Sequence, residues 1–136
     1  MEASKVQSST HRLFRIRLEL ARSREHVQGA KDEGYTFVAP LDDTGHISVE
    51  GWKQDRPLCF VHRLEKGLTV QRGLLVHRPG GPGGATWAFD YEADKTIDEE
   101  AGYRFGAHAF VVGEYVSVRD ADGELHTYRV AEVRPA

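Results

Sequence analysis

Two histidines stand in repeated Val-His-Arg triplets, at His62 and His77, and the glycine-rich stretch PGGPGG follows at residues 79–84. Imidazole and guanidinium groups beside glycines are residue types that metal ligation, proton transfer and anion binding use. The stretch lacks the GK[ST] ending of a phosphate-binding loop, and its two prolines remove backbone N–H donors that an anion would need. We therefore interpret residues 79–84 as a loop between strands.

The residues around the two histidines have the pattern of a hairpin, with strands at 58–64 and 68–78 and a loop at 65–67. This hairpin predicts that the two imidazoles are far apart, because the second one lies well along the partner strand. A shared metal ion or a shared proton is therefore not expected.

His62 faces Val70 in this register, and His77 lies seven residues further along, on the opposite face of the sheet. At about 3.3 Å per residue the separation is roughly 23 Å, whereas zinc–nitrogen bonds are about 2.0–2.1 Å long. His62 shares its face with mostly apolar residues. We expect it to be a histidine of the core or its rim, and we keep it as a possible ligand-binding residue.

A second candidate site is the segment at residues 102–110, which mixes glycine, aromatic and ionisable residues more densely than any other. If the fold forms a pocket, we expect Tyr103, Arg104 and His108 to bind a ligand there, near the end of a barrel strand. The alternative is a connection shaped by glycine, whose aromatic residues close the end of the barrel.

The first predicted strand and an aromatic stripe supply candidate residues for binding a partner. Arg15 and Arg17 alternate with apolar residues, so they face solvent or a partner. Trp87, Phe89 and Tyr91 alternate as well, and such a stripe belongs to the core more often than to a stacking surface. We select Arg15, Arg17 and Trp87 as partner-binding candidates.

The sequence predicts no metal site and no catalytic residue, and it identifies no cofactor. The acidic run at residues 90–101 has several oxygen donors of a calcium loop, but Lys95 replaces the glycine of the sharp turn and Ala101 the bidentate glutamate. Cys59 is the only cysteine, which excludes an intrachain disulfide and a cysteine-rich zinc site. Whether any reaction is catalysed stays open, and the residue types favour a protein that is not an enzyme.

Seven strands must position these residues, and they are predicted from apolar runs bounded by glycine, proline and acidic turns. They cover residues 14–20, 35–39, 58–64, 68–78, 85–91, 109–119 and 125–134. Ser48 is predicted to cap a short helix at 49–54 that carries Trp52, and Asp-Gly in the turn at 120–124 is a strong hairpin signal. The predicted fold class is all-β: a single antiparallel β-barrel or curved β-sandwich of about seven strands, with at most one short helix.

The 136 residues have a net charge of -3 and are 40% hydrophobic, which indicates one globular domain over residues 1–136. The polar residues 1–11 are expected to form a flexible N-terminal tail. No apolar run approaches the about 20 residues that cross a bilayer, and the N-terminus lacks the apolar region of a signal peptide. We expect a cytoplasmic protein without a membrane partner.

The preferred expectation is a non-enzymatic binding or protein-interaction module, which forms a homodimer or captures a protein partner through an exposed sheet face or the barrel mouth. The alternative is a small-molecule-binding barrel or an enzyme with a pocket around residues 102–110. A nucleic-acid-binding barrel that uses the N-terminal arginines and the aromatic stripe ranks third. Nucleic acid is disfavoured because strongly acidic residues follow the stripe.

Overall fold

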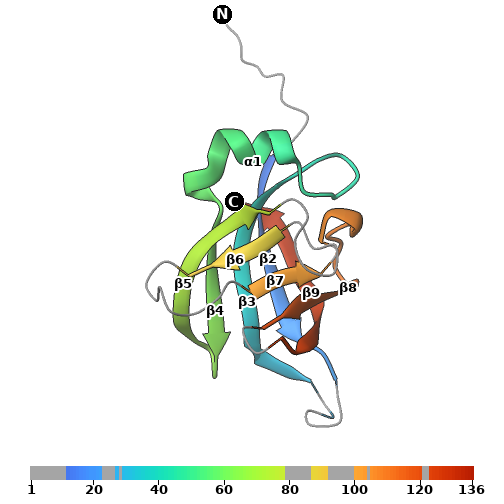
Figure 1. Cartoon of the computed structure of the whole chain (residues 1–136). Coiled ribbons are helices and arrows are strands. Elements are labelled where there is room, and N and C mark those ends of the chain that lie inside the picture. The colour runs from blue at the N-terminus through green and yellow to red at the C-terminus, as the bar shows by residue number, and fades with distance from the viewer. Residues whose placement is uncertain are drawn as a thin grey trace, which may run out of the picture.

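The computed structural model is a closed antiparallel β-barrel, in which each strand pairs with the next and the last strand, β9, pairs with the first, β2 (Figure 1). It describes residues 12–22, 27, 29–78, 87–91, 100–103, 105–120 and 123–136, with the backbone alone for 100–103. The strands are β2 (Arg12–Leu20), β3 (Ala30–Leu41), β4 (Phe60–Glu65), β5 (Leu68–His77), β6 (Trp87–Asp90), β7 (Glu100–Tyr103), β8 (Tyr115–Arg119) and β9 (Leu125–Pro135). The predicted antiparallel all-β fold is confirmed. The predicted tail at 1–11, the PGGPGG loop and most of the acidic run lie outside the described residues.

Strand β2 has the alternation that its sequence predicts, with Ile16 and Leu18 fully buried and Arg15 and Arg17 on the outer face. Because β2 pairs with β3 on one side and with β9 on the other, its backbone hydrogen-bonding groups are used on both sides. A partner therefore cannot extend the sheet at β2, and only its outward side chains are available for binding.

Aromatic rings fill the interior of the barrel. The ring of Phe37 lies 5.3 Å from that of Phe89, 5.7 Å from that of Phe110 and 6.1 Å from that of Phe105, measured between centroids. Trp87 is also in this core, at 2% exposure, so the aromatic stripe is buried. The barrel is therefore a packed core rather than an open channel, as expected for about eight strands.

One end of the barrel is covered by helix α1 (Val49–Asp55), which continues into the 3-10 helix η1 (Arg56–Leu58) (Figure 1). The predicted helix is confirmed together with its cap, because the Ser48 hydroxyl accepts a hydrogen bond of 3.0 Å from the backbone N–H of Gly51. Buried Trp52 donates its indole N–H to the Leu75 carbonyl at 2.8 Å, which fixes α1 to β5. No helix in the described ranges is long and apolar enough to span a membrane.

The strand boundaries differ from the prediction at β3, which covers Ala30–Leu41 where only 35–39 was predicted, and in the second half of the chain. Strand β7 is absent from the prediction because its four residues, Glu-Ala-Gly-Tyr, have no alternation to signal it. The strand predicted over 109–119 begins only at Tyr115, since a turn precedes it in which the Glu114 N–H bonds to the Val111 carbonyl at 3.0 Å. The predicted hairpin around Asp-Gly is confirmed by the antiparallel pairing of β8 with β9.

The register of the β4–β5 hairpin corrects the predicted one. Its turn has only two residues, Lys66 and Gly67, both with positive φ, as a type I′ turn requires. A bulge then leaves Val70 without a register partner, so His62 pairs with Arg72 instead of Val70. The register expected from sequence was wrong by two residues, one from the shorter turn and one from the bulge at Val70.

The faces of β4 are also reversed relative to the prediction. Val61 is fully buried in the barrel, so its neighbours Phe60 and His62 point outward. His62 is therefore a half-buried residue of the outer surface and not of the barrel core. The outer face looked like a core face in the sequence because apolar residues occupy both sides of this strand.

Candidate functional site

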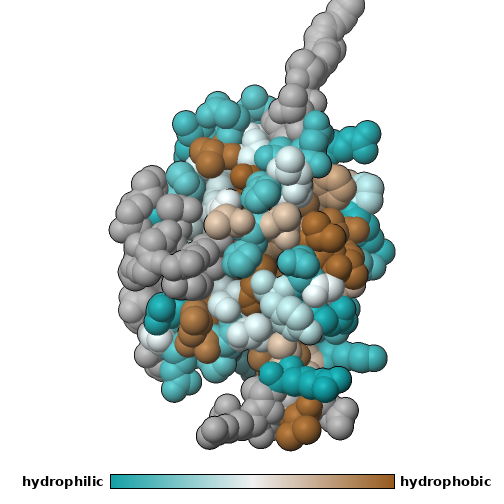
Figure 2. Space-filling model, turned by 90° about the vertical axis from the view of Figure 1, so that its right-hand side faces the viewer, coloured by the Kyte–Doolittle hydropathy of each residue, from teal (hydrophilic) through white to brown (hydrophobic). Residues whose placement is uncertain are grey.

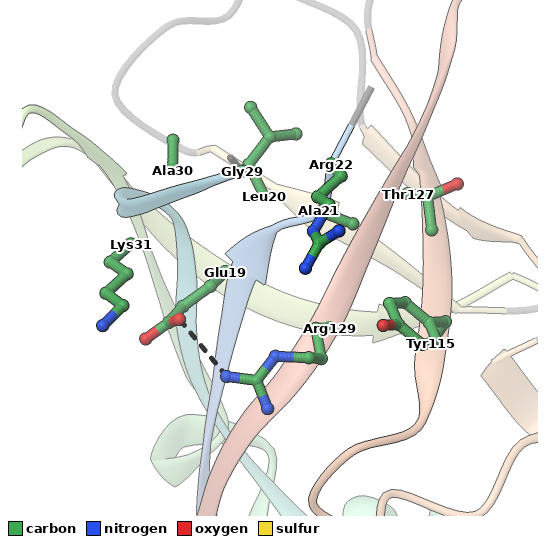
Figure 3. Close-up of a pocket in the computed structure, with 10 residues that line it drawn as sticks. All are labelled: Glu19, Leu20, Ala21, Arg22, Gly29, Ala30, Lys31, Tyr115, Thr127 and Arg129. Atoms are coloured by element: carbon green, nitrogen blue, oxygen red, sulfur yellow. Dashed lines mark ion pairs between the residues drawn. The ribbon is translucent and has the colours of Figure 1, made fainter. Parts of the chain in front are cut away.

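A groove of about 700 Å³ opens on the outside of the barrel, where β2 and β3 meet β8 and β9 (Figure 3). Its walls are formed by cationic residues, by a tyrosine and by residues at the end of β2 and the start of β3. The residues that line it are Glu19, Leu20, Ala21, Arg22, Gly29, Ala30, Lys31, Tyr115, Thr127 and Arg129. This volume is within the range of small-ligand and peptide side-chain sites.

Local backbone geometry shapes the groove. Ala21 continues the line of β2 by donating its N–H to the Thr127 carbonyl at 3.0 Å. Gly29 then has a φ of 76°, and a Cβ at this position would lie 3.0 Å from the Leu20 carbonyl oxygen. Glycine adopts this positive φ readily and has no Cβ to meet the Leu20 carbonyl. The chain can therefore turn at Gly29 and place Ala30 opposite Leu20 in the sheet.

The groove carries a net positive charge, from Arg22, Lys31 and Arg129 against Glu19. Glu19 is the single acidic lining residue, and its carboxylate is shared by Arg17, at 3.3 Å, and Arg129, at 3.6 Å. Within the part of the chain that the structure describes, Arg22 and Lys31 have no carboxylate partner. In Figure 3, Arg22 lies beyond the end of β2 and Arg129 reaches from β9 toward Glu19, with Lys31 toward β3 and Tyr115 toward β8. The groove therefore offers positive charge that its own carboxylate does not neutralise.

Comparison with protein-family models, with curated proteins and with solved structures found no match. The site is therefore interpreted from its own geometry and chemistry.

The outer face of β2 to β5 brings together two residues that were selected separately from the sequence, Arg15 and His62. Arg15 lies over the Phe60 ring, with its guanidinium carbon 5.6 Å from the centroid, and the Phe60 and His62 rings are 5.1 Å apart. Partial burial lowers the pKa of His62, and the positive charges of Arg72 and Arg15 lower this pKa further. The imidazole is thus close enough to both guanidinium groups to respond to their charge.

The other two partner-binding candidates, Arg17 and Trp87, lie on opposite sides of the barrel wall. Arg17 faces outward and binds Glu19, and it also donates a hydrogen bond of 2.9 Å to the Lys31 carbonyl. It thereby holds the start of β3 against β2 beside the groove. Trp87 is inside the barrel, where its ring contacts Trp52 at 5.6 Å, so it is not available to a partner.

The predicted pocket around residues 102–110 can be placed only in part. The side chains of Tyr103 and Arg104 lie outside the described residues, and His108 is half-buried. Phe105 and Phe110 are buried and pack against each other, with ring centroids 5.2 Å apart. These two rings extend the core, as the alternative interpretation of this segment expected.

The two Val-His-Arg histidines lie on opposite faces, as the sequence predicted, although fewer residues separate them along β5. His62 pairs with Arg72, which is five residues from His77, or roughly 17 Å along the strand. His77 contacts Trp87 at 4.7 Å and Trp52 at 5.8 Å. Burial lowers the pKa of His77, and nearby Lys53 adds to this effect.

A hairpin cluster of Asp120, Glu124 and His126 is the one group within the described ranges whose three side chains could reach a common metal ion. The Asp120 carboxylate, however, already binds the His126 ring at 3.0 Å and the Glu124 N–H at 2.9 Å. These contacts account for the cluster as part of the β8–β9 turn. We therefore do not assign a metal to it.

Arg22 is one of the N-terminal arginines that the sequence offered as a basic surface, whereas the groove residues Lys31, Tyr115 and Arg129 were not identified from the sequence. The four residues come from four separate segments, and no spacing rule connects them. The pairing of Glu19 with Arg129, which follows from barrel closure, is what brings the segments together. The only available signal was the excess of arginine and lysine near the N-terminus, which cannot indicate where the fold places β9.

Proposed function

We propose that this protein is a non-enzymatic binding module that holds an acidic segment of a partner protein in the groove between β2, β3, β8 and β9. The observation that supports this function most directly is the unneutralised positive charge of Arg22 and Lys31 in a groove whose one carboxylate is shared by Arg17 and Arg129. Positive grooves attract acidic chains and accelerate their association.

Tyr115 supports a protein partner in this groove. It pairs with Arg129 across the β8–β9 ladder, points outward and is 56% exposed. Tyrosine and arginine are enriched at protein interfaces because each combines a flat contact surface with hydrogen-bond donors. The pair therefore supplies both an apolar contact and a charge for an incoming segment.

Two features favour binding over catalysis in the described part of the chain. The interior is packed with aromatic rings, so a substrate has no place there. Cys59, the residue type best suited to be a nucleophile, is fully buried, and burial together with Asp55 raises its pKa to about 12. A thiol with this pKa is not an activated nucleophile at neutral pH.

A fluorescently labelled peptide of aspartate and glutamate residues provides the test, with binding followed by anisotropy at low ionic strength. We expect salt-sensitive binding that Lys31→Ala and Arg22→Ala each weaken severalfold, because each removes one cation from the groove. Lys53→Ala is the matched control, since Lys53 is an exposed cation on α1 that does not line the groove and pairs with Glu50 at 3.8 Å. Equal weakening by all three variants would reject the groove as the binding site, and so would undetectable binding.

A further inference from the structure

A second group of cations is centred on His62, on the outer face of β2 to β5. His62 pairs with Arg72 on β5 and with Thr36 on β3, so a guanidinium and a hydroxyl flank the imidazole across the sheet. Directly paired residues have Cβ atoms about 4.5–5.5 Å apart, within reach of one small ligand. The group shares strands β2 and β3 with the groove, but none of Arg15, His62 and Arg72 lines the groove, so the two sites are made of different residues.

The two arginines of this group are not neutralised by any carboxylate of the described residues. Within the described ranges neither Arg15 nor Arg72 forms an ion pair, whereas Arg17 and Arg63 pair with glutamates at 3.3 and 3.1 Å. Partial burial is the first cause of the lowered pKa of His62, and the positive charges of Arg72 and Arg15 lower this pKa further. An anion placed among the three would remove this repulsion and favour the charged imidazole.

The arrangement is also partly fixed before a ligand arrives. Arg15 starts on β2 and reaches the Phe60 ring on β4, so its side chain crosses β3 and lies against the sheet. Phe60 in turn contacts His62 at 5.1 Å. A guanidinium held by a ring loses less conformational entropy on binding than a free one, which favours tight recognition.

We propose that Arg15, His62 and Arg72 bind a phosphate monoester on a side chain of a partner protein. Two unpaired guanidinium groups match a ligand of charge near −2, which a phosphate monoester has at neutral pH and a carboxylate does not. The planar guanidinium of arginine can also donate two parallel hydrogen bonds to two of the phosphate oxygens. His62 and the Thr36 hydroxyl can each donate to a further oxygen.

A protein is the source of phosphate that this surface favours. Strand β5 exposes Leu68 and Val70, at 70% and 47%, next to Arg72, and these residues suit apolar side chains beside a phosphorylated residue. Single-stranded nucleic acid would instead need a free ring for its bases. Phe60 does not offer one, because Arg15 lies over it and His62 is beside it.

The test compares four fluorescent probes by anisotropy: a short phosphoserine peptide with flanking leucine and valine, its unphosphorylated form, its glutamate form, and a single-stranded oligonucleotide. We expect the phosphopeptide to bind at least about tenfold more tightly than the glutamate form, which corresponds to about 1.4 kcal/mol. Equal affinity of the phosphorylated and unphosphorylated peptides would overturn the proposal. Tighter binding of the oligonucleotide would overturn it in favour of nucleic acid, and full competition by equimolar inorganic phosphate would overturn the protein source.

Matched variants locate the site. Arg72→Met and Arg15→Met keep much of the aliphatic stem and remove the charge, and each should weaken the phosphopeptide about tenfold. Arg119→Met is the control, because Arg119 is an outward arginine of β8 that binds the Gly123 carbonyl at 2.8 Å. Lys31→Ala should leave phosphopeptide binding unchanged, and this result would support two independent sites. Loss of phosphopeptide binding in Lys31→Ala would assign the phosphate to the groove and overturn the site at His62.

Discussion

The guanidinium carbon of Arg15 lies 5.6 Å from the centroid of the Phe60 ring, although β3 runs between the strands that carry these two residues. Val38, the register partner of Arg15 on β3, is only 2% exposed despite its outward position. The long side chain of Arg15 thus covers apolar surface on the outside of the barrel while keeping its charge at the surface.

This contact predicts different effects for two substitutions of Arg15. Arg15→Ala uncovers Val38 and Phe60 and should lower the free energy of unfolding by about 1 kcal/mol. Arg15→Met keeps an apolar stem and should cost less than about half of that. Urea denaturation of the two variants measures the difference, and equal losses would show that the charge, and not the cover, is what stabilises the sheet.

A close approach of two strands predicts that Gly73 cannot be replaced. A Cβ at Gly73 would lie 2.0 Å from the Asp90 carbonyl oxygen, so Gly73→Ala must displace the backbone of β6 and should cost about 3 kcal/mol or more. Gly113→Ala is the comparison, because Gly113 has a φ of 98° but a Cβ added there would meet no heavy atom within 4 Å outside its chain neighbours, which leaves a conformational cost of about 1–2 kcal/mol. Thermal unfolding of both variants tests the order, which should not be reversed.

The buried thiol of Cys59 should be unreactive in the folded protein. Its pKa is raised to about 12, first by burial and then by Asp55, so the thiolate is scarce at about pH 8. We expect iodoacetamide to modify Cys59 at least about a hundredfold faster in denaturing urea than in buffer, as followed by mass spectrometry. Rapid modification without urea would contradict both the burial and the raised pKa.

The contact of His77 with Trp87 predicts a fluorescence titration. Protonated imidazole quenches indole emission, and burial lowers the pKa of His77 below its ordinary 6.5, with Lys53 adding to the effect. Emission should therefore stay constant as the pH falls to about 6.5 and then decrease with a midpoint below that value. His77→Gln should abolish the transition, and a midpoint above about 6.5 would contradict the environment described for this ring.

The same lowered pKa makes stability depend on pH in a known direction. Folded His77 binds its proton less readily than the unfolded chain does. Its contribution to the free energy of unfolding is therefore fully present above the unfolded pKa of about 6.5. It then decreases as the pH falls toward the folded pKa. His62 contributes with the same sign, because burial, Arg72 and Arg15 lower its pKa as well.

Local patterns carried most of the fold prediction. Alternation identified β2 with Ile16 and Leu18 in the core, Asp-Gly identified the β8–β9 hairpin, and Ser48 was recognised as the cap of α1. Each of these depends on neighbours within a few residues, which a single sequence displays. The short strand β7 was missed because four residues without alternation give no such signal.

The candidate sites depend on relationships that local sequence does not contain. His62 faces Arg72 because a two-residue turn and a bulge at Val70 shift the ladder. Turn type and bulges change which residues face each other while leaving the apolar pattern nearly intact. The sequence could therefore nominate Arg15 and His62 singly but could not place them near one another.

By itself, the sequence determined that this protein forms an antiparallel β-structure with an alternating aromatic stripe and cationic residues on its first strand. Only the tertiary structure decided which cations share a surface. Barrel closure places Arg129 beside Glu19, 110 positions earlier (129 − 19) in the chain, and the groove forms at that junction (Figures 1 and 3). Hydrophobic and hydrophilic residues lie close together on the face of the molecule that Figure 2 shows. The physical reason is that strand pairing between distant segments is selected by the packing of the whole core, so outward charges are brought together by residues that they never contact.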